Sequence, residues 1–215
     1  MSKDITNLLK LNYEDACIFL QKKYGLPKRD YFATEECKSK TKISRTIEGL
    51  CVHHLDEDKA IMLSSKEYAL KNPWEYQTKE RLVYCTYLEH LLLHLLIVEY
   101  PHKDKNENEA VGIGGCINFL IPDLNDMFNN EGWSEGWRLN VKTAVIDFED
   151  DFNLIKERIS KTESFNLNAE QTYPKLTKEE ARDKILSRSG KSEYAMTKNV
   201  TDLIKQYILD KKQEN

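Results

Sequence analysis

The fold of this chain is decided by two stretches of its sequence, Cys51-Val-His-His-Leu-Asp56 and Arg81-Leu-Val-Tyr-Cys-Thr-Tyr-Leu-Glu-His-Leu-Leu-Leu-His94. They hold four of the five histidines in the 215 residues. Adjacent histidines on a strand point to opposite sides, and two histidines four residues apart share one face of a helix. The spacing therefore predicts strand, loop, strand and helix. Three imidazoles are expected to converge on a divalent metal ion, and the fourth is left over as a base.

Local signals set the bounds of these elements. Residues 49–55 form a short apolar run, which predicts a strand that turns at residues 56–58. Residues 81–85 are β-branched and aromatic and predict a second strand. Residues 86–89 have the form of a capping box, so a helix is expected to begin there and to end before Pro101. The helix is apolar nearly all round, which is typical of a buried central helix.

Apolar periodicity predicts that the rest of the chain is mostly helical. The expected segments are helices at 13–24, 110–128 (broken by Pro122), 137–159, 177–188 and 198–212, a helical turn at 65–70 and a linker over 160–175. The predicted fold class is α+β and mostly α. We expect a core of residues 1–165, with the strand–strand–helix unit at about 49–98, and a helical C-terminal extension over 166–215.

Composition favours a soluble protein of the cytoplasm. No apolar run is long enough for a membrane span, and the opening Met1-Ser-Lys-Asp-Ile lacks the apolar stretch of a signal peptide. The five cysteines are odd in number, scattered and without a Cys-x-x-Cys pair. Such usage fits a reducing compartment better than a disulfide framework or a cysteine-rich zinc site.

Charge is unevenly distributed along the chain. The net charge is −4, and residues 101–170 carry 7 basic and 14 acidic side chains. This balance argues against a generic nucleic-acid coat, so local patches would have to hold a phosphate backbone. One such group precedes the first strand and consists of Lys38, Lys40, Lys42 and Arg45. Phosphate contact and a solvated surface are equally open interpretations of these four residues.

Histidine chemistry fits a hydrolytic site. Neutral imidazole is the commonest transition-metal ligand, and three protein ligands with an open position are typical of a catalytic metal site. His90 and His94 would supply two ligands, and the pair at residues 53 and 54 would supply the third. The other member of that pair would be free to take a proton from water at neutral pH.

These two stretches resemble the HNH nucleases, the ββα-metal or His-Me finger superfamily, over about residues 45–98. The resemblance implies a metal-dependent endonuclease that hydrolyses phosphodiester bonds of nucleic acid, with DNA as the expected substrate. It implies one divalent ion, Mg²⁺ or Zn²⁺ with Mn²⁺ or Ni²⁺ as alternatives, held by His53, His90 and His94. By the same resemblance His54 is the general base, and the products carry 5′-phosphate and 3′-hydroxyl ends.

One position departs from the family pattern. Arg81 stands where the family has an asparagine that orients the base, and it is the second expected catalytic residue. Together with the negative net charge, this departure leaves a second class of function open. In that class the chain is an inactive scaffold that binds or inhibits a protein partner through the acidic segment 101–170, and the histidines hold a structural metal. An open metal position would favour the nuclease, whereas four protein ligands would favour the binding protein.

Two further motifs are weaker. The stretch His90-Leu-Leu-Leu-His94 lacks the glutamate of a zincin helix. Gly112-Ile-Gly114-Gly115 has the wrong spacing for a dinucleotide fingerprint, so we expect these glycines to serve helix packing instead.

Overall fold

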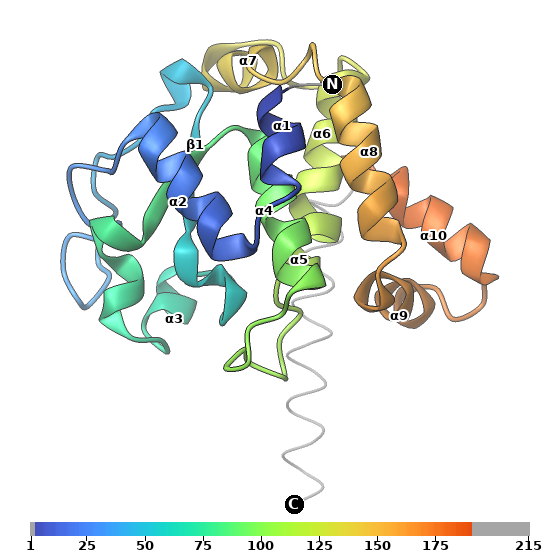
Figure 1. The fold of residues 1–215 in the computed structure, drawn as a ribbon, viewed down its shortest axis with the longest axis horizontal. Coiled ribbons are helices and arrows are strands. Elements are labelled where there is room, and N and C mark those ends of the chain that lie inside the picture. The colour runs from blue at the N-terminus through green and yellow to red at the C-terminus, as the bar shows by residue number, and fades with distance from the viewer. Residues whose placement is uncertain (1–2, 191–215) are drawn as a thin grey trace, which may run out of the picture.

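The computed structural model describes residues 3–190 of the chain (Figure 1). Within this range the protein is mostly α-helical and carries one two-stranded antiparallel sheet, which confirms the predicted fold class. The helices are α1 (Lys3–Leu8), α2 (Tyr13–Tyr24), α3 (Lys66–Ala69), α4 (Tyr87–Glu99), α5 (Ile113–Gly115), α6 (Ile121–Phe128), α7 (Gly136–Thr143), α8 (Glu149–Ser160), α9 (Glu163–Thr172) and α10 (Lys178–Leu186). The strands are β1 (Cys51–His54) and β2 (Leu82–Cys85), and short 3-10 turns include η1 (Thr46–Glu48) and η2 (Leu55–Asp58).

The sheet and α4 form the strand–strand–helix unit that the histidine spacing predicts. In the antiparallel register Cys51 lies opposite Cys85. One residue past β2, the Thr86 hydroxyl accepts a hydrogen bond from the Glu89 amide (3.2 Å), and the Glu89 carboxylate accepts one from the Thr86 amide (2.8 Å). This capping box confirms the predicted helix start. Because α4 follows β2 without a loop, its histidines are held in a fixed position relative to β1.

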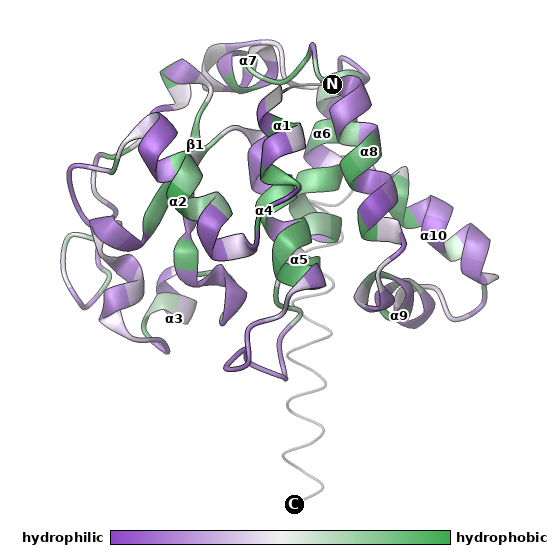
Figure 2. Cartoon of the chain, viewed as in Figure 1, coloured by the Kyte–Doolittle hydropathy of each residue, from purple (hydrophilic) through white to green (hydrophobic). Residues whose placement is uncertain are grey.

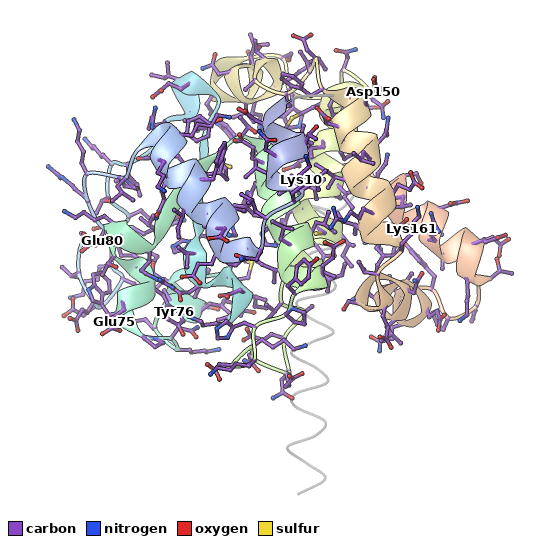
Figure 3. The ribbon with its side chains drawn as sticks, viewed as in Figure 1. Lys10, Glu75, Tyr76, Glu80, Asp150 and Lys161 are labelled. Atoms are coloured by element: carbon purple, nitrogen blue, oxygen red, sulfur yellow. The ribbon has the colours of Figure 1, made fainter. Side chains whose placement is uncertain are left out.

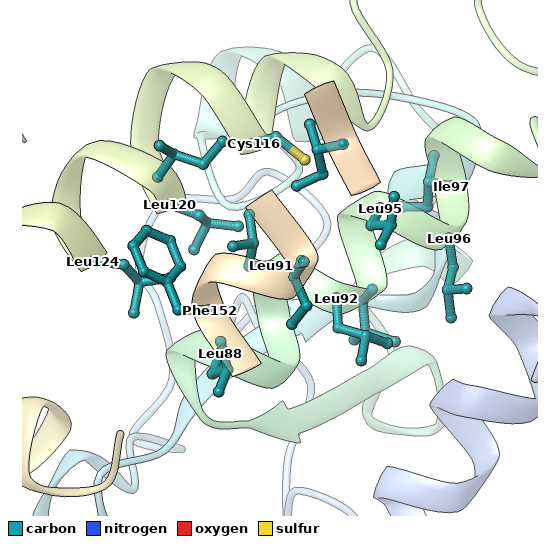
Figure 4. Packing of buried hydrophobic residues seen from close by; sticks show 14 of the residues in the cluster. Leu88, Leu91, Leu92, Leu95, Leu96, Ile97, Cys116, Leu120, Leu124 and Phe152 are labelled. Carbon is teal, nitrogen blue, oxygen red and sulfur yellow. The ribbon is translucent and has the colours of Figure 1, made fainter. Parts of the chain in front are cut away.

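Helix α4 lies at the centre of the main hydrophobic core, as its apolar sequence predicts. Figure 2 shows it as a hydrophobic segment with α1 and α2 on one side and α6 and α8 on the other. In Figure 4, Leu88 and Leu91 of α4 lie close to Leu124 of α6 and Phe152 of α8. Full burial of each such side chain contributes roughly 1.5–3 kcal/mol.

The charged side chains labelled in Figure 3 are exposed and include Lys10, Glu80, Asp150 and Lys161. Among the described residues no helix has the length and apolar character that crossing a membrane requires.

Two predictions over residues 137–175 are wrong. The single helix expected at 137–159 is divided into α7 and α8, because α7 packs against η1 whereas α8 packs against α4. The linker expected at 160–175 contains α9, which the Thr162 hydroxyl caps by accepting a hydrogen bond from the Phe165 amide (3.3 Å). Phe165 and Ala169 of α9 are buried in the main core.

The helix expected at 110–128 is interrupted earlier than predicted. A π-helical segment, Cys116–Leu120, joins α5 to α6, and Pro122 lies within the first turn of α6. Proline has no N–H to donate and its ring crowds the preceding turn, so a wider turn before it keeps the chain helical.

The C-terminal part of the prediction is tested only in part. Helix α10 confirms the expected helix at 177–188, and a capping box at Thr177 begins it. Its Ala181 and Ile185 belong to the main core. The helix expected at 198–212 lies outside the described residues, and the division of the chain at residue 165 stays a prediction.

Candidate metal centre

Three of the four histidines in the strand–strand–helix unit lie close together. His53 comes from β1, and His90 and His94 lie one turn apart on α4. The Nε2 atoms of His90 and His94 are 3.3 Å apart. The His53 ring centroid is 4.9 Å from that of His90 and 5.3 Å from that of His94. The predicted convergence of these three imidazoles is therefore present.

A fourth group, Glu57, joins this cluster from η2. Its Oε2 atom lies 3.2 Å from Nε2 of His94 and 3.4 Å from Nδ1 of His53. The four ligand atoms all lie within 4.8 Å of one another. The sequence predicts a plain turn at residues 56–58, which gives no sign of this carboxylate. A 3-10 turn directly after β1 brings Glu57 back towards the strand it follows.

The spacing of the donor atoms is compatible with a tetrahedral ion. A metal about 2.0–2.1 Å from each nitrogen or oxygen donor gives a tetrahedron with edges of about 3.3–3.4 Å. Three of the six donor pairs are 3.2, 3.3 and 3.4 Å apart, and all six are within 4.8 Å. Three imidazoles with one carboxylate are a donor set for zinc-like transition metals, whereas Mg²⁺ prefers oxygen ligands and retains several waters. The site thus fits a divalent ion of the zinc class better than Mg²⁺.

Hydrogen bonds hold both α4 histidines in the tautomer that a metal requires. Nδ1 of His94 lies 3.0 Å from the Gly112 carbonyl, which can only accept, so the lone pair is on Nε2. Nδ1 of His90 lies 3.5 Å from the Cys51 sulfur. Because the Cys51 thiol donates to the Cys85 carbonyl (3.2 Å), its sulfur is left to accept from His90. Both Nε2 lone pairs therefore point into the cluster.

Tyr13 of α2 fixes the tautomer of His53 in the same way. The Tyr13 hydroxyl donates to the Leu55 carbonyl (3.0 Å), so its oxygen accepts from Nε2 of His53 at 2.6 Å. The lone pair of His53 is then on Nδ1. That atom is fully buried and has no hydrogen-bond partner, although Glu57 lies 3.4 Å away. An unpaired buried acceptor beside two others is costly, and a cation bound there would satisfy it.

The protonation states of the clustered side chains are also those that metal binding requires. Burial lowers the pKa of His53 and lowers that of His90 well below its ordinary value. Burial opposes ionisation of Glu57, but the surrounding histidines, His53 first among them, outweigh it and hold the pKa of Glu57 well below its usual range. A carboxylate with neutral imidazoles is the state in which these groups bind a metal.

His54 lies on the other side of β1, as the strand alternation predicts. Its Nε2 atom is 3.2 Å from Oε1 of Gln77, whose amide nitrogen donates to the Leu63 carbonyl. That arrangement places a proton on Nε2 and the lone pair on Nδ1. Nδ1 of His54 is buried without a hydrogen-bond partner, 3.4 Å from Oε1 of Glu57. The base predicted from the sequence therefore has its free lone pair next to the ligand cluster.

The contact that orients His54, which the family pattern assigns to an asparagine at the position of Arg81, is made by Gln77. The Arg81 guanidinium instead forms two hydrogen bonds with the Asp56 carboxylate, at 2.7 and 2.5 Å. Asp56 precedes Glu57 in η2 and also pairs with Lys59. Arg81 thus fixes the turn that carries Glu57. Nothing in the sequence signals the part that Gln77 plays, since it reaches His54 from a separate 3-10 turn.

The four basic residues ahead of β1 divide into two kinds. Lys38, Lys40 and Lys42 are exposed, whereas Arg45 pairs with Glu48 and donates to the backbone of α2. The ammonium group of Lys40 lies 5.1 Å from the ring centroid of Tyr31, which in turn packs 4.6 Å from that of His54. The Tyr31 ring therefore contacts both Lys40 and the expected base, His54. Nucleic-acid contact by these residues stays a prediction.

Two of the glycines after α4 serve packing, as predicted. A Cβ atom at Gly115 would come within 2.3 Å of Cε1 of His94, so the backbone of α5 lies directly on the imidazole. Gly112, at φ +74°, turns its carbonyl towards the same ring and lies against Ile97. The apolar helix pair thus supports one ligand of the cluster.

Comparisons of the chain with protein-family models, curated proteins and solved structures found no match. The structure itself defines a mostly α-helical protein. Its strand–strand–helix unit carries a buried cluster of three histidines and a glutamate that could hold a metal ion.

Proposed function

We propose that this protein is a metal-dependent endonuclease that hydrolyses phosphodiester bonds by a one-metal mechanism of the HNH type. One observation carries the proposal. Within a strand–strand–helix unit, Glu57 lies between a set of metal-ligating nitrogens and the unpaired Nδ1 atom of His54. A ligand cluster beside a correctly protonated base is what hydrolysis of a phosphate ester requires.

Each residue has a defined part in this proposal. A zinc-class cation held by His53, His90 and His94 would supply positive charge that stabilises the scissile phosphate and its leaving oxygen. His54 takes the proton of the attacking water on Nδ1, while Gln77 holds the ring through Nε2. Mutation of a general base of this kind typically costs 10²–10⁴-fold in rate, by the order of magnitude known for such groups.

The site residues differ in how far they are exposed to solvent. Glu57 keeps 15% of its side-chain surface exposed and His90 is half-buried, whereas His53 and His54 are fully covered. The Tyr31 ring packs 4.6 Å from that of His54, and the ammonium group of the exposed Lys40 lies 5.1 Å from the centre of the Tyr31 ring. We propose that a phosphate held by Lys38, Lys40 or Lys42 approaches the base from this side.

Cleavage of supercoiled plasmid and of labelled DNA and RNA oligonucleotides tests the proposal, with Mg²⁺, Mn²⁺, Ni²⁺ or Zn²⁺ present. His54→Ala should abolish metal-dependent cleavage and still bind metal. His102→Ala is the matched control, because His102 is the one histidine that is neither an expected ligand nor the expected base, and it lies in a charged loop. Cleavage that survives His54→Ala, or that is absent with every metal and substrate, would overturn the proposal.

A second candidate function is favoured by Glu57. If its carboxylate is a fourth protein ligand, the centre is closed, as structural zinc sites are. The protein would then be a binding or inhibitor scaffold that contacts a basic partner through the acidic segment 101–170. This alternative predicts tightly held zinc, loss of thermal stability on chelation and no cleavage under any condition.

A further inference from the structure

A second group of ligand atoms lies on the far side of His90. Cys51 and Cys85 are directly opposite in the register of β1 and β2, with their sulfur atoms 3.6 Å apart. Nδ1 of His90 lies 3.5 Å from the Cys51 sulfur. The three ligand atoms all lie within 4.8 Å of one another. The absence of a Cys-x-x-Cys pair argues against a cysteine-rich site at the level of sequence, but strand pairing brings these two cysteines together across 34 residues.

The distances match those of a sulfur-rich metal site. A tetrahedral ion with bonds of about 2.3 Å to sulfur and about 2.0 Å to nitrogen has edges of roughly 3.8 Å between sulfurs and roughly 3.5 Å between sulfur and nitrogen. The corresponding separations here are 3.6 and 3.5 Å. Little movement of the side chains is therefore needed to bind such an ion.

We propose that Cys51, Cys85 and Nδ1 of His90 form a second metal site, selective for a thiophilic cation such as Cd²⁺ or Cu⁺, which shares His90 with the histidine–glutamate centre. A divalent ion displaces one proton from each thiol, and the two thiolates balance its charge. Cys85 is fully buried and Cys51 is half-buried, so the ion enters from the Cys51 side.

Sharing His90 makes the two sites compete. A neutral imidazole has one lone pair, and it cannot serve Nδ1 and Nε2 together unless the ring also loses its remaining proton. An ion on the thiolates should therefore weaken binding at the histidine–glutamate centre, and the reverse follows by linkage. This coupling rests on the proposed metal centre, whereas binding to the thiolates does not.

Cadmium is the probe that tests the second site. Titration of the reduced full chain should produce an ultraviolet thiolate-to-cadmium charge-transfer band, with a ¹¹³Cd chemical shift that indicates two sulfur ligands. Cys51→Ser and Cys85→Ser should each abolish that two-sulfur signal, whereas Cys116→Ser should keep it. Cys116 is the matched control because it is fully buried in the core near α4. Far-ultraviolet circular dichroism checks that each variant folds.

The same measurement on the wild-type chain stays decisive if a variant does not fold. A cadmium shift without sulfur ligands, or a two-sulfur signal that survives both serine variants, would overturn the second site. The coupling is tested by preloading one equivalent of Zn²⁺. We expect the apparent cadmium affinity for the thiolates to fall at least tenfold, and an unchanged affinity contradicts the sharing of His90. Neither result depends on nuclease activity, so failure here is distinguishable from failure of the proposed function.

Discussion

At the scale of single residues, the candidate metal centre has neighbours that fix the orientation of its histidines. Tyr13 is one of them, since its hydroxyl accepts from Nε2 of His53 at 2.6 Å. Tyr13→Phe removes that acceptor and frees His53 to adopt the wrong tautomer. Loss of such an outer contact typically weakens metal affinity about 10–100-fold. Competition with a chromophoric chelator measures the effect on Zn²⁺.

Tyr84→Phe is the control for this prediction. Tyr84 is also buried, and its hydroxyl donates to the Ile43 carbonyl away from the cluster. Its zinc affinity should equal that of the wild-type chain. Equal losses in the two variants would mean that the Tyr13 effect is general destabilisation.

Glu57 gives a second residue-scale prediction. Glu57→Gln keeps the size of the side chain but removes the charge that faces His53, His54 and His94. We expect zinc affinity to fall at least tenfold, because a neutral amide is a poorer ligand and balances no positive charge. Glu48→Gln, an exposed glutamate in η1, is the matched control. Unchanged zinc affinity in Glu57→Gln would exclude the carboxylate from the centre.

The sequence predicted the ligands that follow a local period and missed those that do not. His90 and His94 share a helix face at a spacing of four, and the adjacent pair at residues 53 and 54 alternates along a strand. Glu57 depends on a 3-10 turn that periodicity cannot distinguish from an open loop. Tyr13 and Gln77 arrive through tertiary packing, which has no signature in the spacing of residues.

At the scale of elements, close packing of α5 on α4 positions His94. Gly115→Ala would place a Cβ atom 2.3 Å from the His94 ring, so one of the two must move. We expect destabilisation of about 1–3 kcal/mol, the usual cost of overpacking, and at least tenfold weaker zinc binding. Chemical denaturation and chelator competition measure the two effects.

The neighbouring glycine provides a matched control. A Cβ atom at Gly114 would lie 3.4 Å from the Ala110 side chain and 4.0 Å from Nδ2 of Asn118, which are ordinary contacts. Gly114→Ala should therefore be neutral or stabilise the chain by about 0.5–1 kcal/mol, through the lower entropy of the unfolded state. Equal behaviour of the two variants would contradict the packing of α5 on His94.

Elements with strong local signals were predicted correctly, and weakly patterned ones were not. Capping boxes at Thr86 and Thr177 marked the starts of α4 and α10. Helix α9 was taken for a linker because few of its side chains are apolar, and tertiary burial of Phe165 and Ala169 is what holds it. The separation of α7 from α8 follows from their different packing partners, which a continuous apolar stripe does not show.

At the scale of the whole molecule, Asp123, a half-buried carboxyl of α6, makes stability depend on pH. Burial, with a smaller contribution from Asp126, raises the pKa of Asp123 to about 6. The folded chain keeps this proton between the unfolded pKa of about 4 and about 6, where the unfolded chain has lost it. The contribution of Asp123 is therefore most favourable below pH 4, and it is lost as pH rises through 6. The loss is on the order of 2–3 kcal/mol.

Asp123→Asn should remove that cost. Relative to the wild-type chain, the variant should gain stability as pH rises from 4 to 6 and keep the gain at pH 7. Urea denaturation at each pH measures the free energy of unfolding of both chains. The histidine cluster titrates in both, so its contribution cancels when one free energy is subtracted from the other. Asp147→Asn, at an exposed position before α8, should show no such trend. A wild-type-to-variant difference that does not change with pH would contradict the buried state of Asp123.

The central claim of the whole account is that the cluster beside Glu57 binds one metal ion through the imidazoles of His53, His90 and His94. X-ray absorption spectroscopy of the chain loaded with one equivalent of Zn²⁺ tests it most directly. We predict stoichiometric binding, with nitrogen and oxygen donors at about 2.0–2.1 Å and the scattering pattern of three imidazoles. A shell dominated by sulfur at about 2.3 Å, or zinc that is lost on gel filtration, would contradict the account.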